Sequence, residues 1–582
     1  MAEVKDYGEL FTADILVVGG SMSGLTTAIR AKENNPELDI LVIDKGIIGW
    51  NGQSTKAGNG IRSTSKHPDG VMNALGYLVH AHTPFLNDQE FLKRYLEVHR
   101  DNIDYMKHCG VQVSCDEDGN ATPLTFIPDA LDMAGVSINV NAQLRAFALK
   151  LGIRLMSRVN VFELLTSKTG KVIGAIGFGM DKGECKIFHA KAVAMATQGC
   201  HFKKIGLEFM GYGTGVGAMY RVGAVMRNVE FSTQVDVVFK KTNTPIYGGF
   251  NMICNKNGEN LTQKYIGHLE WEVTPALVNA MVKEVAAGNG PLWVDLEQPD
   301  EVRMMIGGTD MDESTQRMMR DKMAWEHLVF SKTAKNIGEV GTKPEATIKT
   351  VIQVEPVKVD TDIRTDVEGL WAPGKVSTQG NAYFGWTRGD GLGNASTTGM
   401  MAGDSIAPYA AAADWDALDL EQIAAYKEKI YAPLNRPSGK SPKEIYDRIE
   451  RYIFDVNKCV LKSETEIHKV YQDIEEMKKI VPQLTADDPH TLAKCLEAAD
   501  TILCLEMIFR SADMRKESRG IMYPHYRTDY PETDNENWLR WINIRQGKDE
   551  MELFTEDIPM WRYPIRPEGY KIPAGHVEEY YV

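Results

Sequence analysis

A strand–turn–helix–strand pattern near the N-terminus constrains the fold of this 582-residue chain most strongly. A short apolar run, Ile15-Leu-Val-Val18, is followed at once by Gly19-Gly-Ser-Met-Ser-Gly24, and the sequence from Leu25 to Glu33 then favours a helix. A second apolar run, Ile40-Leu-Val-Ile43, ends at the acidic residue Asp44. Short apolar runs of this kind indicate buried parallel strands, so the segment predicts the opening of a Rossmann-like α/β domain.

Each part of this segment has a physical task in binding a dinucleotide. Gly19 permits the tight turn, and Gly24 lets the helix pack close to the strand. Ser21 replaces the second glycine of the G-x-G-x-x-G pattern, and its small hydroxyl can donate to a phosphate. The helix N-terminus offers free N–H groups to a pyrophosphate. Asp44 lies 20 residues after Gly24 and can accept hydrogen bonds from a ribose diol, with Lys45 beside it.

The loop after the second strand favours FAD over NAD as the expected dinucleotide. An NAD enzyme normally continues into another strand–helix unit, whereas this chain continues through the glycine-rich and polar stretch Gly49–Gly60. A long loop of small residues suits a backbone laid along an extended FAD. We therefore expect Ser54, Gly58, Asn59 and Gly60 to contact the cofactor.

Composition and charge narrow the class of protein. The formal net charge of −15 argues against a general nucleic-acid binder, which needs a basic face. The chain has no run of 18 apolar residues and no basic–apolar pattern at its N-terminus, so we expect no membrane span, no signal peptide and a cytoplasmic location. None of the eight cysteines forms a CxxC pair, and no metal site is predicted.

Further segments, in order along the chain, match the motifs of one known family. They are Val172–Gly177, Ala196-Thr-Gln-Gly199, Gly213–Ala218, Gly369-Leu-Trp-Ala-Pro-Gly374, Arg388–Gly399 and the stretch from Arg515 to Trp538. On these motifs the chain resembles the fumarate reductase and succinate dehydrogenase flavoprotein superfamily. The resemblance implies further FAD-contacting residues: Thr197, Gly199, Gly374, Asn394, Ala395 and Ser396.

The resemblance also implies an architecture. The α/β, Rossmann-like FAD-binding domain would be built from residues 1–235 and 345–410, with an inserted α+β capping domain at 236–344 and a C-terminal helical domain at 411–582. The sequence supports helices in the last part independently. Asp488 is typical of an N-cap, with Pro489 at the first helical position, and Ser463 with Glu466 is typical of a capping box.

The chain departs from the family pattern at several positions. The stretch Trp50–Gly60 contains no His to attach FAD covalently, so we expect noncovalent FAD. Val235-Asp-Val237 stands where dicarboxylate enzymes carry His-Pro-Thr, and Tyr247-Gly-Gly-Phe250 stands where they carry Arg-Gly-Glu-Gly-Gly. The stretch Gln353-Val-Glu-Pro356 lacks a further His. These departures disfavour fumarate or succinate as the substrate.

Three residues are the candidate catalytic groups. Arg388 lies in a glycine-dense turn and suits a carboxylate, sulfate or phosphoryl group; the alternative is a structural pair with Asp390. Tyr247 is a candidate proton donor, or else a turn residue of the capping domain. Lys375 replaces a common Glu of the family and is a candidate cation beside the flavin. Glu355 is a weaker acid–base candidate, for which a salt bridge is the more ordinary role.

These observations favour the catalytic flavoprotein subunit of an FAD-dependent oxidoreductase. Such a protein would pass two electrons between flavin and a small anionic substrate, and exchange electrons with an iron–sulfur or other electron-transfer partner. The alternatives are activity of the adenylylsulfate reductase alpha type, fumarate-like reduction of a C=C bond, and a noncatalytic FAD electron-transfer subunit.

The absence of His from Trp50–Gly60 yields a direct prediction. Acid precipitation of the purified yellow protein should release the flavin into the supernatant, as measured by absorbance. Flavin that stays with the pellet would contradict the prediction of noncovalent binding.

Overall fold

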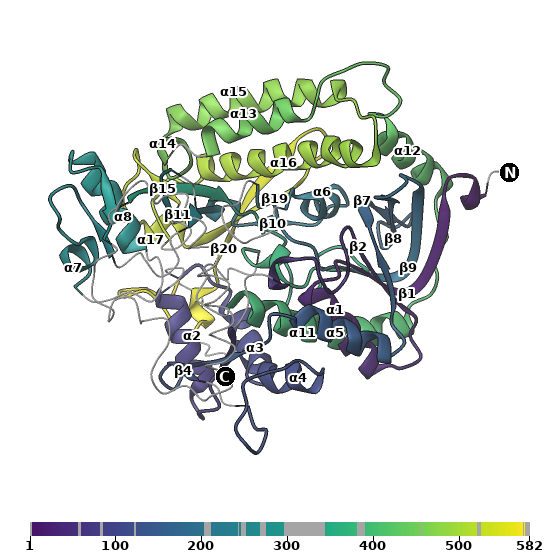
Figure 1. The fold of residues 1–582 in the computed structure, drawn as a ribbon, viewed down its shortest axis with the longest axis horizontal. Helices are drawn as coiled ribbons and strands as arrows, with labels where there is room; N and C mark the ends of the chain where they lie inside the picture. The colour runs from purple at the N-terminus through teal and green to yellow at the C-terminus, as the bar shows by residue number, and fades with distance from the viewer. Residues whose placement is uncertain are drawn as a thin grey trace.

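The computed structural model describes residues 3–55, 60–81, 85–121, 124–202, 211–241, 244–245, 252–267, 275–295, 344–380, 390–453, 456–520, 525–573 and 576. Four of the predicted site residues lie outside these ranges: Gly58, Asn59, Tyr247 and Arg388. The predicted α/β fold class is confirmed, and Figure 1 shows its main sheet beside a layer of long C-terminal helices.

The main sheet has seven strands and carries the predicted nucleotide-binding opening. Five strands are parallel: β6, β2, β1, β9 and β16; β8 and β7 continue the sheet beyond β9 in antiparallel pairing. Their bounds are β1 Glu9–Val18, β2 Ile40–Asp44, β6 Arg154–Ser157, β7 Val159–Thr166, β8 Val172–Gly179, β9 Cys185–Met195 and β16 Leu370–Trp371. The apolar runs in β1 and β2 are buried because helices cover the faces of the sheet.

The register of the parallel strands brings four chain segments to one edge of the sheet. Val18 at the end of β1 pairs with Ile43 on one side and with Met195 on the other. Trp371 at the end of β16 pairs with Ala194. The segments that follow β1, β2, β9 and β16 therefore all leave the sheet at its carboxyl edge, where ligands bind in open α/β sheets.

Helix α1 (Met22–Asn34) packs closely against α11 (Asp390–Ala412). Glycines on α11 allow this approach: a Cβ on Gly399 would lie 2.8 Å from Cβ of Thr26, and one on Gly403 would lie 2.5 Å from Cβ of Arg30. On the other side, Nε1 of Trp371 donates a 2.8 Å hydrogen bond to Ser405. The α11 helix is thereby joined both to α1 and to the strand β16.

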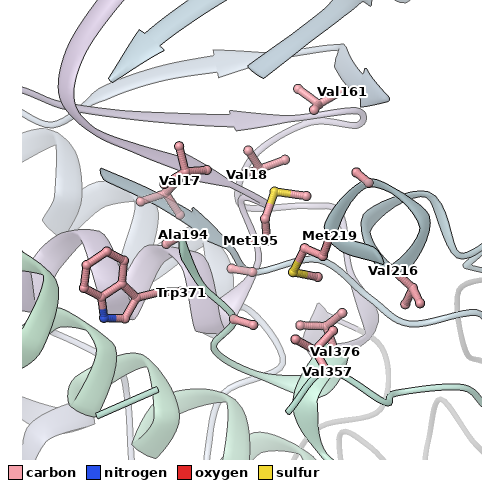
Figure 2. Packing of buried hydrophobic residues seen from close by; sticks show 14 of the residues in the cluster. Val17, Val18, Val161, Ala194, Met195, Val216, Met219, Val357, Trp371 and Val376 are labelled. Atoms are coloured by element: carbon pink, nitrogen blue, oxygen red, sulfur yellow. The ribbon is translucent and has the colours of Figure 1, made fainter. Parts of the chain in front are cut away.

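The core at the carboxyl edge is apolar and continuous. Figure 2 shows Met195 beside Met219 of α6 (Thr214–Arg221), and Val17, Ala194 and Trp371 belong to the same apolar cluster. Val357 and Val376, which come from the segments before and after β16, lie together beneath α6 in the same view. This core fixes the positions of the loops that leave the sheet above it.

A second, smaller layer includes part of the predicted capping region. Its five-stranded antiparallel sheet has the order β12-β11-β15-β14-β13 and its own apolar core. The bounds are β11 Thr233–Phe239, β12 Thr244–Pro245, β13 Ile253–Cys254, β14 Leu292–Val294, β15 Glu345–Ile352, α7 Leu261–Tyr265 and α8 Pro275–Ala286. Strand β11 crosses the predicted start of the insertion at residue 236, and it pairs with β15, which begins just after the predicted end.

The remaining elements of the N-terminal part include a small three-stranded sheet with the order β3-β5-β4. They are β3 Gly60–Thr64, β4 Leu124–Ile127, β5 Leu131–Gly135, α2 Gly70–Ala81, α3 Gln89–His99, α4 Asn102–His108, α5 Val140–Lys150 and β10 Met226–Arg227. Short 3-10 helices are η1 Val4–Asp6, η2 Gln53–Thr55, η3 Val229–Phe231, η5 Lys375–Ser377, η6 Val481–Gln483 and η7 Met560–Arg562. Strand β3 continues directly from the loop that was predicted to contact FAD.

The C-terminal part is mainly helical. It contains α12 Leu420–Tyr431, α13 Lys443–Ile453, α14 Val456–Cys459, β17 Leu461–Lys462, α15 Glu464–Ile480, α16 Pro489–Met514, β18 Tyr526–Arg527, α17 Asn535–Trp538, β19 Arg540–Gln546 and β20 Met551–Asp557. Both predicted N-caps are confirmed: Asp488 accepts a hydrogen bond from Thr491 N–H, and Ser463 accepts one from Glu466 N–H. The Glu466 side chain accepts from Lys469, and the reciprocal bond that would complete the capping box stays a prediction. Among the helices that the structure describes, none has the length and apolar character to cross a membrane.

A strand pairing and a buried group of ion pairs join the C-terminal part to the nucleotide-binding part. The hairpin β19–β20 extends β10 in an antiparallel sheet. Beside it, Arg515 lies between Glu230 of η3 and Glu517, with N–O distances of 2.7 and 2.8 Å, and all three side chains are fully buried. Arg519 also binds Glu517: its Nε donates to the oxygen that Arg515 contacts, and its Nη2 donates to the other oxygen, each at 2.8 Å. The predicted domain boundaries at residues 235, 344 and 410 stay predictions.

The buried Arg515 cluster yields a stability prediction. Arg515→Met leaves the carboxylates of Glu230 and Glu517 buried with their shared cation removed, which costs about 3–5 kcal/mol in comparable cases. Thermal unfolding should show a clear fall in midpoint. The matched control is Arg545→Met, which breaks a pair with Glu552 whose members are about half exposed and should change the midpoint little. Equal shifts in the two variants would contradict the structural role given to Arg515.

Candidate cofactor site

The glycine turn between β1 and α1 is the centre of the site. Gly19 has φ of +117°, and a Cβ on it would lie 2.3 Å from the carbonyl oxygen of Ala196. A Cβ on Gly24 would lie 1.8 Å from the carbonyl oxygen of Gly19. Ser21, the N-cap of α1, makes no side-chain bond to the first turn of its helix. The N-terminus of α1 is thus held against the strand edge in the geometry that suits a pyrophosphate.

The loop after β2 is tied to this turn by side-chain hydrogen bonds. The hydroxyls of Ser21 and Ser54 lie 2.7 Å apart, and Asn141 of α5 bonds to both of them. Because the Ser54 hydroxyl donates its one proton to the side-chain amide oxygen of Asn141, the Ser21 hydroxyl is the donor to Ser54. Ser21 and Ser54 were predicted separately from the sequence, and the structure brings them together. Asn141 was not predicted from the sequence.

Asp44 fastens the turn to the loop on the other side. One carboxylate oxygen accepts from Gly20 N–H at 2.7 Å, and the other accepts from Gly46 N–H and from Asn51, each at 2.6 Å. Asp44 is 7% exposed. Its carboxylate can accept further hydrogen bonds, and a ribose diol would donate to these remaining lone pairs. Lys45 points elsewhere, with its ammonium 3.5 Å from Glu497 of α16.

Buried polar atoms without a partner mark where a polar ligand fits. Within the described residues, Ser23 Oγ, Thr197 Oγ1 and Gln53 Nε2 are buried and make no hydrogen bond. A buried unsatisfied donor costs about 1–3 kcal/mol, so native proteins seldom leave such groups together without cause. All three lie on segments at the carboxyl edge of the sheet. They fit the polar chain and phosphates of FAD, to which these residues would donate.

The segment after β16 lies against the first turn of α1. Gly374 has φ of +85°, and a Cβ on it would lie 2.6 Å from the hydroxyl of Ser23. Its N–H donates to Thr398 of α11 at 2.9 Å. Gly199, in the segment after β9, lies against the carbonyl oxygen of Val354. Gly374 therefore lies against the first turn of α1, and Gly199 lies against the segment that carries Glu355. That these glycines contact FAD stays a prediction.

The predicted residues on β3 and α11 have different environments. Gly60 begins β3 and pairs with Gly135. Asn394 is buried and Ala395 is half-buried on the first turns of α11. The Ser396 hydroxyl lies within hydrogen-bond distance of the Asn102 side-chain oxygen on α4 and of the carbonyl oxygen of Leu392, so it serves helix packing. Roles of these residues toward a cofactor stay predictions.

The start of α11 is held by a buried ion pair that sequence analysis did not find. Nη1 of Arg62 on β3 lies 2.7 Å from the carboxylate of Asp390, and both side chains are almost fully buried. Asp390, the residue considered as a structural partner of Arg388, is therefore bound by Arg62. Burial and the nearby Arg62 charge also lower the pKa of His99 to about 3, which keeps that imidazole neutral beside the pair.

Lys375 and Glu355 meet at the edge of the site. Nζ of Lys375 lies 2.7 Å from Oε1 of Gln53 and 3.5 Å from Oε1 of Glu355. The same oxygen of Glu355 lies 2.7 Å from Nε2 of His201. Sequence analysis missed His201, since a single His next to a predicted loop carries no spacing signal. The contact depends on the pairing of Cys200 with Val354, which only the fold reveals.

Comparison with known proteins agrees with this geometry. A family model described as an FAD binding domain matches residues 14–393, and one described as the fumarate reductase flavoprotein C-terminus matches residues 452–570. One of the subunits of the fumarate reductase (CoM/CoB) of Methanothermobacter marburgensis is 22% identical over 578 residues, covering 92% of this chain and 98% of that protein.

Solved structures show the same fold. A mutant of the E. coli quinol fumarate reductase superposes with a TM-score of 0.80 at 18% identity, covering 96% of this chain and 98% of that one. Adenylylsulfate reductase of Archaeoglobus fulgidus superposes with a TM-score of 0.74 at 18% identity, covering 94% and 96%.

The fold and the glycine turn define an FAD-binding flavoprotein. The chain belongs to the fumarate reductase and succinate dehydrogenase flavoprotein family, and it is an FAD-dependent oxidoreductase. FAD supplies the two-electron chemistry when bound, and the protein supplies binding, orientation and electrostatics.

Two substitutions test the cofactor site. Gly24→Ala places a methyl group 1.8 Å from a carbonyl oxygen, so the purified protein should lose most of its flavin absorbance relative to protein absorbance. Thr197→Val keeps the shape and removes one buried hydroxyl, so FAD should bind several-fold more weakly, in line with about 0.5–1.5 kcal/mol for one hydrogen bond.

The matched control is Gly76→Ala on α2, where a Cβ would meet only a side-chain carbon at 3.6 Å. This variant should keep the flavin content of the wild type. Full flavin content in Gly24→Ala, or wild-type affinity in Thr197→Val, would contradict the assignment of the site.

Proposed function

We propose that this protein is a catalytic flavoprotein subunit that transfers two electrons between FAD and a small anionic substrate. The observation that carries the proposal is the convergence of Ser23, Gln53 and Thr197, each with a buried polar atom that lacks a partner, around the turn at Gly19. Such a site holds FAD, and the family to which the chain belongs consists of FAD-dependent oxidoreductases.

Arg388 is the proposed anion-binding group. It lies two residues before Asp390, the first residue of α11, and α11 reaches the cofactor site through the bond from Gly374 to Thr398. Because Arg62 binds the Asp390 carboxylate, the negative charge nearest to Arg388 in sequence has its own partner. A guanidinium at this place would orient a carboxylate, sulfate or phosphoryl group. Tyr247 remains the proposed proton donor.

The substrate is proposed to differ from fumarate. The stretches Val235–Val237, Tyr247–Phe250 and Gln353–Pro356 lack the groups that resemblance to the dicarboxylate enzymes would lead us to expect for binding or protonating the substrate. In this structure Glu355 forms a buried pair with His201 and contacts Lys375. This arrangement supports a different anion. Adenylylsulfate-type chemistry is the named alternative, and adenylylsulfate reductase shares the fold.

The electron partner is proposed to be a separate iron–sulfur or other electron-transfer subunit. The support is twofold. The relative from Methanothermobacter marburgensis is itself named as one subunit of its enzyme. In addition, the eight cysteines of this chain are spread widely along the sequence, and none forms a CxxC pair that would suit a cluster within it.

The proposal is tested by adding fumarate, succinate, sulfite and adenylylsulfate to the purified holoprotein while recording the flavin spectrum. One anion should shift or bleach the flavin band. Arg388→Met should bind FAD normally but should need an anion concentration about 100-fold higher or more for the same spectral response. The control is Arg158→Met, which replaces an exposed arginine paired with Asp181 and should respond as the wild type does.

A flavin that ignores every anion would favour the noncatalytic electron-transfer alternative. An unchanged response in Arg388→Met would remove this residue from the substrate site.

A further inference from the structure

Five polar side chains form a connected group at the edge of the cofactor site, here called the Lys375 cluster: Gln53, Gln198, His201, Glu355 and Lys375. Lys375 donates to Gln53 at 2.7 Å and lies 3.5 Å from Glu355. Glu355 accepts from Nε2 of His201 at 2.7 Å. Gln198 lies 3.3 Å from Nδ1 of His201 and 3.4 Å from the side-chain oxygen of Gln53. The bonds run continuously from Lys375 to His201 and back to Gln53.

Three of the segments that carry the Lys375 cluster touch the glycine turn or the first turn of α1. Gln53 is next to Ser54, which bonds to Ser21. Lys375 follows Gly374, which lies against Ser23. Gln198 follows Thr197, whose preceding residue lies against Gly19.

The fourth segment carries Glu355 and is fixed by its neighbours. Its N–H donates to the Gln379 side chain at 2.8 Å, and its carbonyl oxygen accepts from Gln379 N–H at 2.9 Å. Two residues further on, Val357 packs with Val376 in the core, as Figure 2 shows. Lys375 and Glu355 are therefore both held by short connections to the same core.

Burial within the Lys375 cluster is graded. The side chains of His201 and Glu355 are 0% and 2% exposed, whereas that of Lys375 is 16% exposed. Gln53 and Gln198 are half-buried, and Gln53 keeps its buried amide nitrogen without a partner. Lys375, Gln53 and Gln198 are thus the more accessible members of the cluster, and His201 and Glu355 are the fully buried ones.

We propose that Glu355 and His201 are positioning residues that hold Lys375 and balance its charge, and that this balance sets the reduction potential of the bound flavin. The inference rests on the proposed function and on the prediction that Lys375 is a cation beside the flavin. A neutral His201 donates its Nε2–H to the carboxylate of Glu355, and its Nδ1 accepts from Gln198. The cluster then carries one positive and one negative charge.

The sign of each effect follows from electrostatics. Reduction places electron density on the flavin, so a nearby cation raises the potential and a nearby anion lowers it. Charges act strongly here because the site is largely removed from water. Lys375→Met should therefore lower the potential, and Glu355→Gln should raise it. In the double variant the two charges disappear together, so the potential should return toward that of the wild type.

His201 acts through Glu355. His201→Phe removes a donor to a buried carboxylate, which raises the pKa of that carboxyl because the charged form loses its hydrogen bond. Protonated Glu355 no longer offsets Lys375, so the potential should rise as it does in Glu355→Gln. Since a raised carboxyl pKa matters below that pKa, the shift should be larger at pH 6 than at pH 9.

The experiment is a spectroelectrochemical titration of the flavin in the purified holoprotein. Each single variant should change the ratio of oxidised to reduced flavin at a fixed potential by about tenfold or more, which is about 30 mV for a two-electron couple. The matched control is Lys186→Met. Lys186 is a mostly buried lysine paired with Glu9 at 2.9 Å, and Glu9 begins β1, at the end of the strand opposite the turn. This control should leave the potential unchanged.

Opposite shifts in Lys375→Met and Glu355→Gln, cancelling in the double variant, support the inference. Shifts of the same sign, or an unchanged potential together with altered FAD affinity, overturn it, because a merely structural cluster would behave in that way. If the variants have the potential of the wild type, and the flavin of the wild type still responds to an anion, the inference fails but the proposed function stands. The predicted shifts in a protein blind to every anion would instead overturn the proposed substrate chemistry.

Discussion

The contact of backbone with backbone at the end of β1 is the constraint on which the rest of the structure depends. Val18 pairs with both Ile43 and Met195, so the turns after three strands begin side by side. Gly19 and Gly24 then leave no room for a side chain between strand and helix. This close packing points the N-terminus of α1 at the place where the segments after β9 and β16 also arrive. A cofactor site results from strand register and from missing side chains before any polar group is considered.

Buried charges decide which distant segments meet around this centre. Arg62 and Asp390 join β3 to the start of α11, and Arg515 joins Glu230 to the C-terminal part. A buried ion pair is a weak source of net stability, because desolvation offsets much of its attraction, but breaking one leaves an unpaired charge. Such pairs therefore penalise wrong arrangements more than they reward the right one. They are suited to a chain whose cofactor site is assembled from segments more than 300 residues apart.

Much of this could be predicted from the sequence because the signals are local. The strand, turn, helix and strand from Ile15 to Asp44 are indicated by apolar runs and by glycine spacing, and Asp488 indicates the start of α16. The family motifs then place Thr197 and Gly374 in the site. All of these residues are recognisable from their immediate neighbours in the chain.

The partners within the site were beyond the reach of the sequence because they are set by tertiary packing. His201 meets Glu355 only because the segments around Cys200 and Val354 pair with each other. Asn141 reaches Ser21 from a helix 120 residues away. Sequence alone could therefore suggest Lys375 as a candidate cation near the flavin, but could not show that a buried carboxylate lies beside Lys375.

We infer that the glycine turn and the loops around it hold the pyrophosphate of an FAD. The most direct measurement is the affinity of the flavin-free protein for FAD and for FMN, determined by fluorescence titration. FMN lacks the second phosphate and the adenosine, so the account predicts that FAD binds at least about 100-fold more tightly, a difference of about 2.8 kcal/mol. Equal affinity for FMN and FAD would show that the turn does not hold the pyrophosphate and would contradict the account.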